Sequence, residues 1–150
     1  MTDSLIIRKA NLNDLDSILL LLNSPAADNG HAMSRIDSSL TLQTILDDPN
    51  YFQIVASTDT GIIGMVTLVI IMQMSHEGAT PALITDLIVA SEKEKSGIAR
   101  QLLDYAVNLA QEYGCYKTII QSDYQAQLTA EACIELGYEP GPPSFSESGN

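Results

Sequence analysis

The sequence lacks the residues that build metal sites and disulfide frameworks. It has no tryptophan, two cysteines and two histidines. Cys115 and Cys133 are too few for a disulfide framework, and neither has a Cys or His neighbour at metal-ligand spacing. The same holds for His31 and His76. We therefore expect two reduced thiols and no metal site.

Long hydrophobic runs are also missing. The longest, Ile62 to Met74, is shorter than the ~18 residues that a membrane-spanning helix needs, and it contains Gly64 and Gln73. The first residues, Met1 to Ser4, do not supply the basic and apolar stretches of a secretory signal. These absences predict a cytoplasmic protein with no membrane partner.

Basic residues are scarce. Seven Lys and Arg stand against 19 Asp and Glu, which gives a formal net charge of -12 at pH 7. Such a charge repels nucleic acid and anionic lipid and attracts amines, although acidity can also serve solubility alone. We expect residues 1–150 to form one domain with a single core, and residues from about 141 to 150 to form a flexible tail.

Hydrophobic periodicity and turn residues predict an α+β chain. Helices are expected after an Asn11 cap, from a cap near Ser38 to before Pro49, and over 96–113 and 127–135. Strands are expected over 5–10, 51–57, 62–72, 82–90 and 117–122. Turns at 58–61 and 75–81 close two antiparallel hairpins. The helix between the last two strands requires these strands to pair in parallel.

The start of the helix over 96–113 is the most informative segment. The first amides of a helix have no internal partner and lie at the positive end of its dipole, so they can bind phosphate where the backbone is approachable. Gly97 and Ala99 provide that access. This segment is therefore a candidate anion site.

Charge at this helix start is mixed. Three bases, Lys93, Lys95 and Arg100, lie within eight residues and are opposed by the helix dipole. A bound anion would remove the conflict. Glu92 and Glu94 remove part of it without any ligand, so charge alone leaves both interpretations open.

The same segment resembles the GNAT N-acetyltransferases, whose signature Arg/Gln-x-x-Gly-x-Gly/Ala opens the long central helix. Here Gly97 and Ala99 match the signature, while Glu94 replaces Arg or Gln. Other similar segments are Gly61-Ile-Ile-Gly64, Asp86-Leu-Ile-Val89, Gly114-Cys-Tyr-Lys117 and Glu135-Leu-Gly-Tyr138. The resemblance is strong over 81–122 and looser over 8–138.

This resemblance implies a mixed, mostly antiparallel sheet of six to seven strands, with helices on both faces and a splayed parallel pair of strands. Acetyl-CoA, or another short acyl-CoA, would lay its pantetheine arm between those strands, bonded to the backbone near Ile88 and Val89. The amides of the helix start would hold the pyrophosphate, and the acid at position 94 would weaken binding. The residues implied there are Glu94, Lys95, Ser96, Gly97, Ile98, Ala99 and Arg100.

Acyl transfer to an amine requires a neutral amine and a proton for the leaving thiolate. The family often supplies the proton from a Tyr in the last helix. Cys133 fills that place here, and it could serve either as the acid or as a small apolar side chain that fills space. The family's base commonly lies at the position of Thr85, which cannot act as one. Asp86 could act as the base, or could only accept hydrogen bonds at a strand bend. Adjacent residues of a strand point to opposite faces, so Asp86 is not interchangeable with position 85. Tyr124 is a reserve acid.

The expected acceptor is a primary amine on a small molecule or a peptide, attacking directly in a ternary complex. The family sets its identity through variable loops, here 23–35 and 75–81, in which His31, His76 and Glu77 either reach the amine or are solvated. Two alternatives stay open, a degenerate relative that binds acyl-CoA as a sensor and an unrelated α+β interaction protein. The expectation that the protein forms a homodimer rests on the family resemblance alone.

Overall fold

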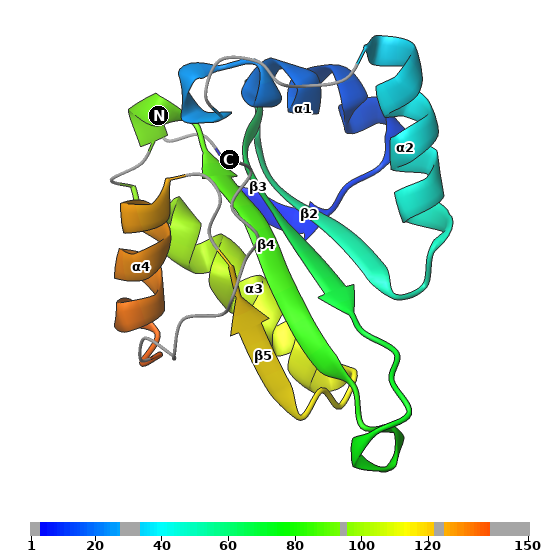
Figure 1. The fold of residues 1–150 in the computed structure, drawn as a ribbon. Coiled ribbons are helices and arrows are strands. Elements are labelled where there is room, and N and C mark those ends of the chain that lie inside the picture. The colour runs from blue at the N-terminus through cyan, green and yellow to red at the C-terminus, as the bar shows by residue number, and fades with distance from the viewer. Residues whose placement is uncertain (1–3, 28–33, 94–95, 122–124, 139–150) are drawn as a thin grey trace, which may run out of the picture.

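Five strands form one mixed sheet in the computed structural model, which describes residues 4–27, 34–93, 96–121 and 125–138. The strands lie in the order β1-β2-β3-β4-β5 (Figure 1). Their bounds are β1 Ile6–Lys9, β2 Tyr51–Thr58, β3 Gly61–Ile70, β4 Pro81–Val89 and β5 Lys117–Ile120. The α-helices are α1 Leu15–Leu22, α2 Arg35–Asp47, α3 Ile98–Glu112 and α4 Ala126–Glu135. Short 3-10 turns are η1 Leu12–Asp14, η2 Pro25–Ala27, η3 His76–Gly78 and η4 Ser91–Lys93.

The strand pairing confirms both predicted hairpins and the parallel crossover. Strands β1 to β4 pair antiparallel in sequence order, and β4 pairs with β5 in parallel. The expected count of six to seven strands is wrong for the described residues, which contain five. Any strand after α4 would need residues beyond Tyr138, and positions 139–150 lie outside the described part of the chain.

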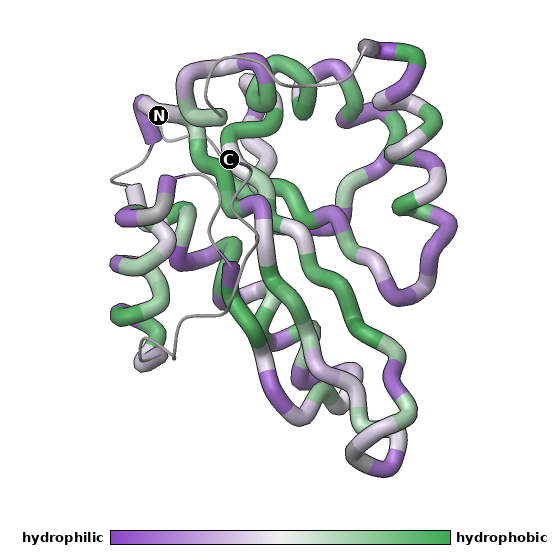
Figure 2. The backbone as a smooth tube through the Cα atoms, in the orientation of Figure 1, coloured by the Kyte–Doolittle hydropathy of each residue, from purple (hydrophilic) through white to green (hydrophobic). Residues whose placement is uncertain are grey.

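Helices cover both faces of the sheet, as expected (Figure 1). Helix α3 packs on β3 and β4 and carries α4 beside it, while α1 and α2 contact the other face. Hydrophobic residues run along β3 and β4, whereas hydrophobic and hydrophilic residues alternate along α2 (Figure 2). The sheet therefore supplies the inner surface of two separate apolar layers.

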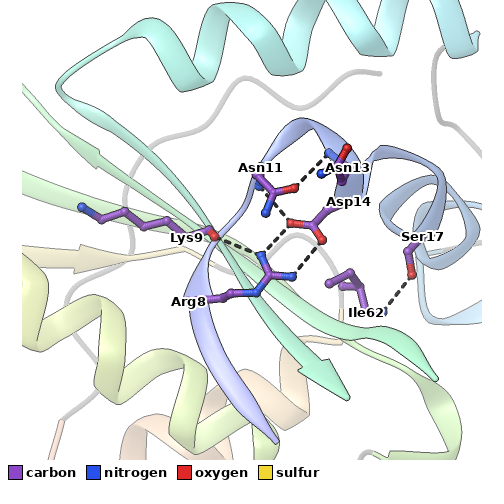
Figure 3. Close-up of polar contacts among 7 residues, drawn as sticks. All are labelled: Arg8, Lys9, Asn11, Asn13, Asp14, Ser17 and Ile62. Carbon is purple, nitrogen blue, oxygen red and sulfur yellow. Dashed lines mark hydrogen bonds and ion pairs between the residues drawn. The ribbon is translucent and has the colours of Figure 1, made fainter. Parts of the chain in front are cut away.

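A capping box fixes the start of α1 against β1 (Figure 3). The Asn11 side chain accepts the N–H of Asn13 at 2.9 Å, and Asp14 Oδ2 accepts the N–H of Asn11 at 2.9 Å. Arg8 on β1 donates two hydrogen bonds to the same carboxylate, of 2.7 and 2.9 Å. Ser17 Oγ accepts the N–H of Ile62 at 2.8 Å, so α1 is also tied to β3. Asn11 is thus confirmed as a cap, that of the turn η1 which leads directly into α1, and two strands fix the helix orientation.

The other helix ends refine the sequence boundaries. Helix α2 begins four residues earlier than expected, because Ser34 accepts the N–H of Asp37, and Ser38 is buried inside the helix rather than capping it. Gly114 follows α3 with a φ of 74°, as its C′ position requires. Helix α3 itself starts at Ile98, two residues after the predicted start, since Ser96 still belongs to the preceding turn.

Candidate functional site

A β-bulge at Asp86 interrupts β4. Its φ is 53°, in the left-handed region that Asp tolerates better than most residues, and the register against β3 shifts between Met65 and Thr67. Ile84 and Leu87, three positions apart, consequently both enter the core beneath α3. The expectation of simple alternation across this part of the strand is therefore wrong, and Asp86 lines a cavity on the α1/α2 face.

Strand β5 accompanies only the first half of β4. The last hydrogen bond between them runs from the N–H of Gln121 to the carbonyl of Ile84, at 2.9 Å. Residues 85–89 of β4 have no β5 partner within the described chain (Figure 1).

Val89 directs its backbone N–H and C=O toward the edge of β4 that faces away from β3. Ala90 donates its N–H to the carbonyl of Ile63 at 2.8 Å, so alternation turns the N–H and C=O of Val89 away from β3. The carboxamide of Gln125 meets both groups, because its Oε1 accepts the Val89 N–H at 2.9 Å and its Nε2 donates to the Val89 carbonyl at 3.0 Å. Ile88 pairs with Met65, so its backbone groups face β3 instead.

The N-terminus of α3 lies next to the end of β4. Gly97 is its N-cap, with a φ of 83°, and a Cβ added there would meet no atom within 4 Å. The first described helical bond runs from the N–H of Gln101 to the carbonyl of Gly97, at 3.2 Å, which leaves three preceding amides without a described carbonyl partner. They belong to Ile98, Ala99 and Arg100. Ser96 differs, since its N–H donates to Lys93 O at 3.1 Å.

A tight contact with β3 holds this helix start in place. A Cβ added at Gly64 would lie 2.9 Å from Leu102 Cδ1 and 3.4 Å from Ile98 Cγ2. Both of these α3 side chains are buried. The absence of a side chain at Gly64 thus allows the first turn of α3 to approach the sheet closely.

A groove of about 530 Å³ opens from the α3 start toward α4. Gly97, Ala99 and Arg100 line its α3 side. Glu131 and Glu135 of α4 line the other side, so the groove carries two acids for one base among these residues. An anion bound here would be drawn to the amides and repelled by the opposite wall.

Helix α4 directs polar atoms inward at four-residue spacing. Gln125 precedes the helix, Thr129 is buried with its hydroxyl unpaired among the described residues, and Cys133 packs half-buried against the core. Residues four apart share one helix face. Burial raises the pKa of the Cys133 thiol, and burial followed by the nearby Cys133 and Asp104 raises the pKa of Tyr138.

The cavity at Asp86 lies on the opposite face of the sheet, under α1 and α2, and measures about 240 Å³. Its floor carries Tyr51, Gln53 and Thr67. The pKa of Tyr51 is raised, first by burial and then by the negative charges of Asp86 and Asp48. The cavity therefore combines one carboxylate with neutral hydrogen-bonding groups.

The structure separates the predicted catalytic residues. Asp86 faces the α1/α2 cavity, and Cys133 packs against the α3 layer, with β4 between the two faces. Tyr124, Glu94, Lys95 and His31 lie outside the described residues. Sequence reasoning missed Gln125, whose contact with Val89 joins segments 36 positions apart and has no local sequence signal.

Metal-binding clusters and membrane-spanning helices are both absent from the described residues. Within those ranges, no three His, Cys, Asp or Glu side chains come together in a way that could hold a metal ion. Over the same part of the chain, no helix has both the length and the apolar character needed to cross a membrane.

The fold matches many solved structures. A transcriptional regulator from Bacillus halodurans C-125 aligns with a TM-score of 0.83 at 21% identity, covering 97% of this chain and 99% of that one. Glucosamine-6-phosphate N-acetyltransferase from Arabidopsis thaliana gives 0.82 at 16% identity, covering 98% and 99%. Aminoglycoside N-acetyltransferase AAC(6')-Iy, solved in complex with CoA, gives 0.79 at 16%, covering 99% and 96%. At these identities the likeness concerns the fold alone.

Comparison with sequences gives the family. No curated protein sequence matches the chain. The model of the acetyltransferase (GNAT) family, in contrast, matches residues 18–138, from the middle of α1 to the residue where the described structure ends. Because that match spans most of the sequence, the chain belongs to the GNAT acetyltransferase family.

Proposed function

We propose that the protein transfers an acetyl group from acetyl-CoA to a primary amine by direct attack in a ternary complex. The observation that carries the proposal is the edge of β4 at Val89, where β5 no longer pairs and a side-chain carboxamide bonds to the backbone, beside the first amides of α3, which have no described carbonyl partner. The edge of a strand can hydrogen-bond to a chain of amides, and the first amides of a helix can donate to a diphosphate. Acetyl-CoA contains both of these ligand groups in one molecule.

The residues present fit this cofactor. The backbone of Val89 already binds a carboxamide, that of Gln125, so it can bind the amides of a pantetheine arm in the same way. The amides of Ile98, Ala99 and Arg100 can donate to the diphosphate, with Gly97 keeping the approach clear. Glu94 and Lys95, which the resemblance also implies for the pyrophosphate site, lie outside the described residues.

When bound, acetyl-CoA would supply a thioester carbonyl as the electrophile. The amine nitrogen forms a bond to that carbonyl carbon, the carbon–sulfur bond breaks with its electron pair on sulfur, and the products are an acetamide and the free thiol. One proton leaves the nitrogen and one reaches the sulfur, so no oxidant or reductant is needed.

The chain's own residues would handle these protons from the two faces of the sheet. Asp86, at the bulge, holds the amine and takes its proton directly or through water. Cys133 donates to the leaving sulfur, and its raised pKa keeps it protonated at neutral pH. Tyr124 remains the second candidate for this donation.

An alternative role is an acyl-CoA sensor with little turnover. Its support is chemical: Cys133 stands where the family often has a Tyr acid, Thr85 stands where the family commonly has a carboxylate base, and Glu94 replaces the signature Arg or Gln.

Calorimetry and a thiol-release assay on the full chain test these possibilities. We expect acetyl-CoA to bind and free thiol to appear when a suitable amine is added. No binding at millimolar acetyl-CoA would refute both roles. Tight binding with no thiol release across polyamines, aminosugars, amino acids and hydrophobic monoamines would favour the sensor.

A further inference from the structure

The cavity under α1 and α2 has an apolar wall and a polar floor. The wall is built by Leu15, Ile18, Leu19 and Leu22 of α1 together with Leu42 and Ile45 of α2. Each of these side chains is buried or half-buried. Ser38 and Thr41 of α2 also line the cavity, so hydrocarbon predominates on this wall but is unbroken only on the α1 side. Polar atoms of a ligand that face α1 would lose their hydration without compensation.

The floor offers neutral hydrogen-bonding groups whose hydrogen bonds to each other and to the backbone are long. Gln53 and Thr67 are partners across β2 and β3, with only 8% and 1% of their surfaces exposed. Thr67 Oγ1 donates to Gln53 Oε1 at 3.3 Å, and Gln53 Nε2 donates to the carbonyl of Val66 at 3.4 Å. These distances are at the long end of the range, so both side chains can also bond to a ligand.

Among the described residues that line the cavity, Asp86 alone carries a formal charge. It sits where β4 bulges, just beyond the last bond between β4 and β5, which joins Ile84 to Gln121. The proposed cofactor arm lies along the same stretch of β4. An ammonium group paired with Asp86 would thus lie at the end of the cavity nearest to the reacting carbonyl.

We infer that the acceptor is a small primary monoamine with one compact aliphatic or aryl group, its nitrogen at Asp86 and its hydrocarbon between α1 and α2. This inference rests on the proposed acetyl transfer and narrows its substrate class. The cavity of about 240 Å³ falls below the ~300–1,000 Å³ of sites for drug-sized ligands, which selects a small molecule.

The same lining disfavours the other amine classes. A polyamine would bury a second ammonium against leucine and isoleucine side chains, with no second carboxylate among the described lining residues. An aminosugar would bury several hydroxyl groups, and the α1 side of the wall offers none of them a partner.

Binding without the cofactor tests the inference separately from the proposed function. Using calorimetry on the full chain, we compare 3-methylbutylamine and 2-phenylethylamine with spermidine, glucosamine and a tripeptide beginning with leucine. The two hydrophobic monoamines are expected to bind at least about tenfold more tightly than spermidine or glucosamine. Equal or tighter binding of either polar amine would overturn the inference, and tighter binding of the tripeptide would overturn its small-molecule part.

Variants assign the two ends of the ligand. Asp86→Asn, which suits the left-handed backbone equally well, is expected to weaken 3-methylbutylamine about tenfold while changing the neutral 3-methylbutanol by less than about twofold. Equal effects on both ligands would place the nitrogen elsewhere and refute the inference.

A larger side chain on the wall provides the steric test. Leu19→Phe should block the hydrocarbon end, whereas Leu20→Phe on the same helix points outward, with Leu20 75% exposed, and should leave amine binding unchanged. Acetyl-CoA affinity, measured on the same proteins, should not change in either variant. If wild-type protein binds the monoamines but not acetyl-CoA, the proposed function fails and the cavity assignment holds; the reverse result overturns the cavity assignment alone.

Discussion

The side chain of Gln125 occupies both backbone hydrogen-bonding groups of Val89, with distances of 2.9 and 3.0 Å. The two residues come from the start of α4 and the end of β4, and they meet where β5 has left the sheet. A carboxamide is chemically equivalent to an amide of the proposed pantetheine arm. Cofactor binding along β4 therefore requires Gln125 to move away.

Removing this side chain should tighten cofactor binding. We expect Gln125→Ala to lower the dissociation constant of acetyl-CoA about fivefold, because displacing a net hydrogen-bond contribution of ~1 kcal/mol is no longer required. Calorimetry measures the change. Gln111→Ala, at an exposed position of α3 away from the groove, is the matched control and should leave the affinity unaltered. Weaker binding by Gln125→Ala would contradict competition for Val89.

Gly97 allows a direct test of the anion site. Gly97→Trp should place a large side chain over the first amides of α3 and weaken acetyl-CoA binding about 10- to 100-fold, the effect of losing one charged hydrogen bond. Gly114→Trp is the control at the other end of the same helix. Both glycines have positive φ, and a Cβ added at either would meet no atom within 4 Å, so the backbone cost should be similar. Equal affinities of the two variants for acetyl-CoA would show that the start of α3 does not bind the cofactor.

Cys133 can be tested through the pH dependence of turnover. If its thiol protonates the leaving sulfur, activity falls as pH rises through its pKa, which burial places above the usual value of about 8.5. Cys133→Ala should lower kcat by about 100-fold and remove this high-pH decline. Cys115→Ala, which removes the other thiol, should keep the wild-type profile. An unaltered profile in Cys133→Ala would assign the proton to another group.

The Arg8–Asp14 pair should make stability depend on acid pH. The hydrogen bonds from Arg8 come first among the causes that lower the pKa of Asp14 below its usual value of about 3.9. Between the folded and unfolded pKa values the unfolded chain binds more protons, so this contribution is complete above about pH 4 to 5 and is lost as pH falls through the folded pKa.

Urea unfolding measures that dependence. Asp14→Asn should lower the free energy of unfolding by about 2 kcal/mol at pH 7, and the difference from wild type should shrink toward pH 3. Asp16→Asn removes the exposed pair with Arg35 and should have little effect at either pH. A difference for Asp14→Asn that persists undiminished at pH 3 would show that the charge is not its cause.

Several features of the fold could be predicted because their causes are local. Asn11 caps its helix through atoms two and three residues away, and Gly114 ends α3 because glycine accepts the left-handed backbone there without strain. Ser34 was missed as a cap because Ser38 has the same side chain and lies one helical turn later. Burial of Ser38, a tertiary property, decides between them.

The amino-acid sequence by itself determined the order of strands and helices, the parallel crossover, the glycine at the start of α3 and the acidic charge. Each follows from periodicity, turn chemistry or composition within a short window. Only the tertiary structure decided that β4 bulges at Asp86, that this carboxylate shares a cavity with Gln53 and Thr67, and that Gln125 reaches Val89. These relationships join residues far apart in the chain, and packing of the sheet against its two helical layers sets them.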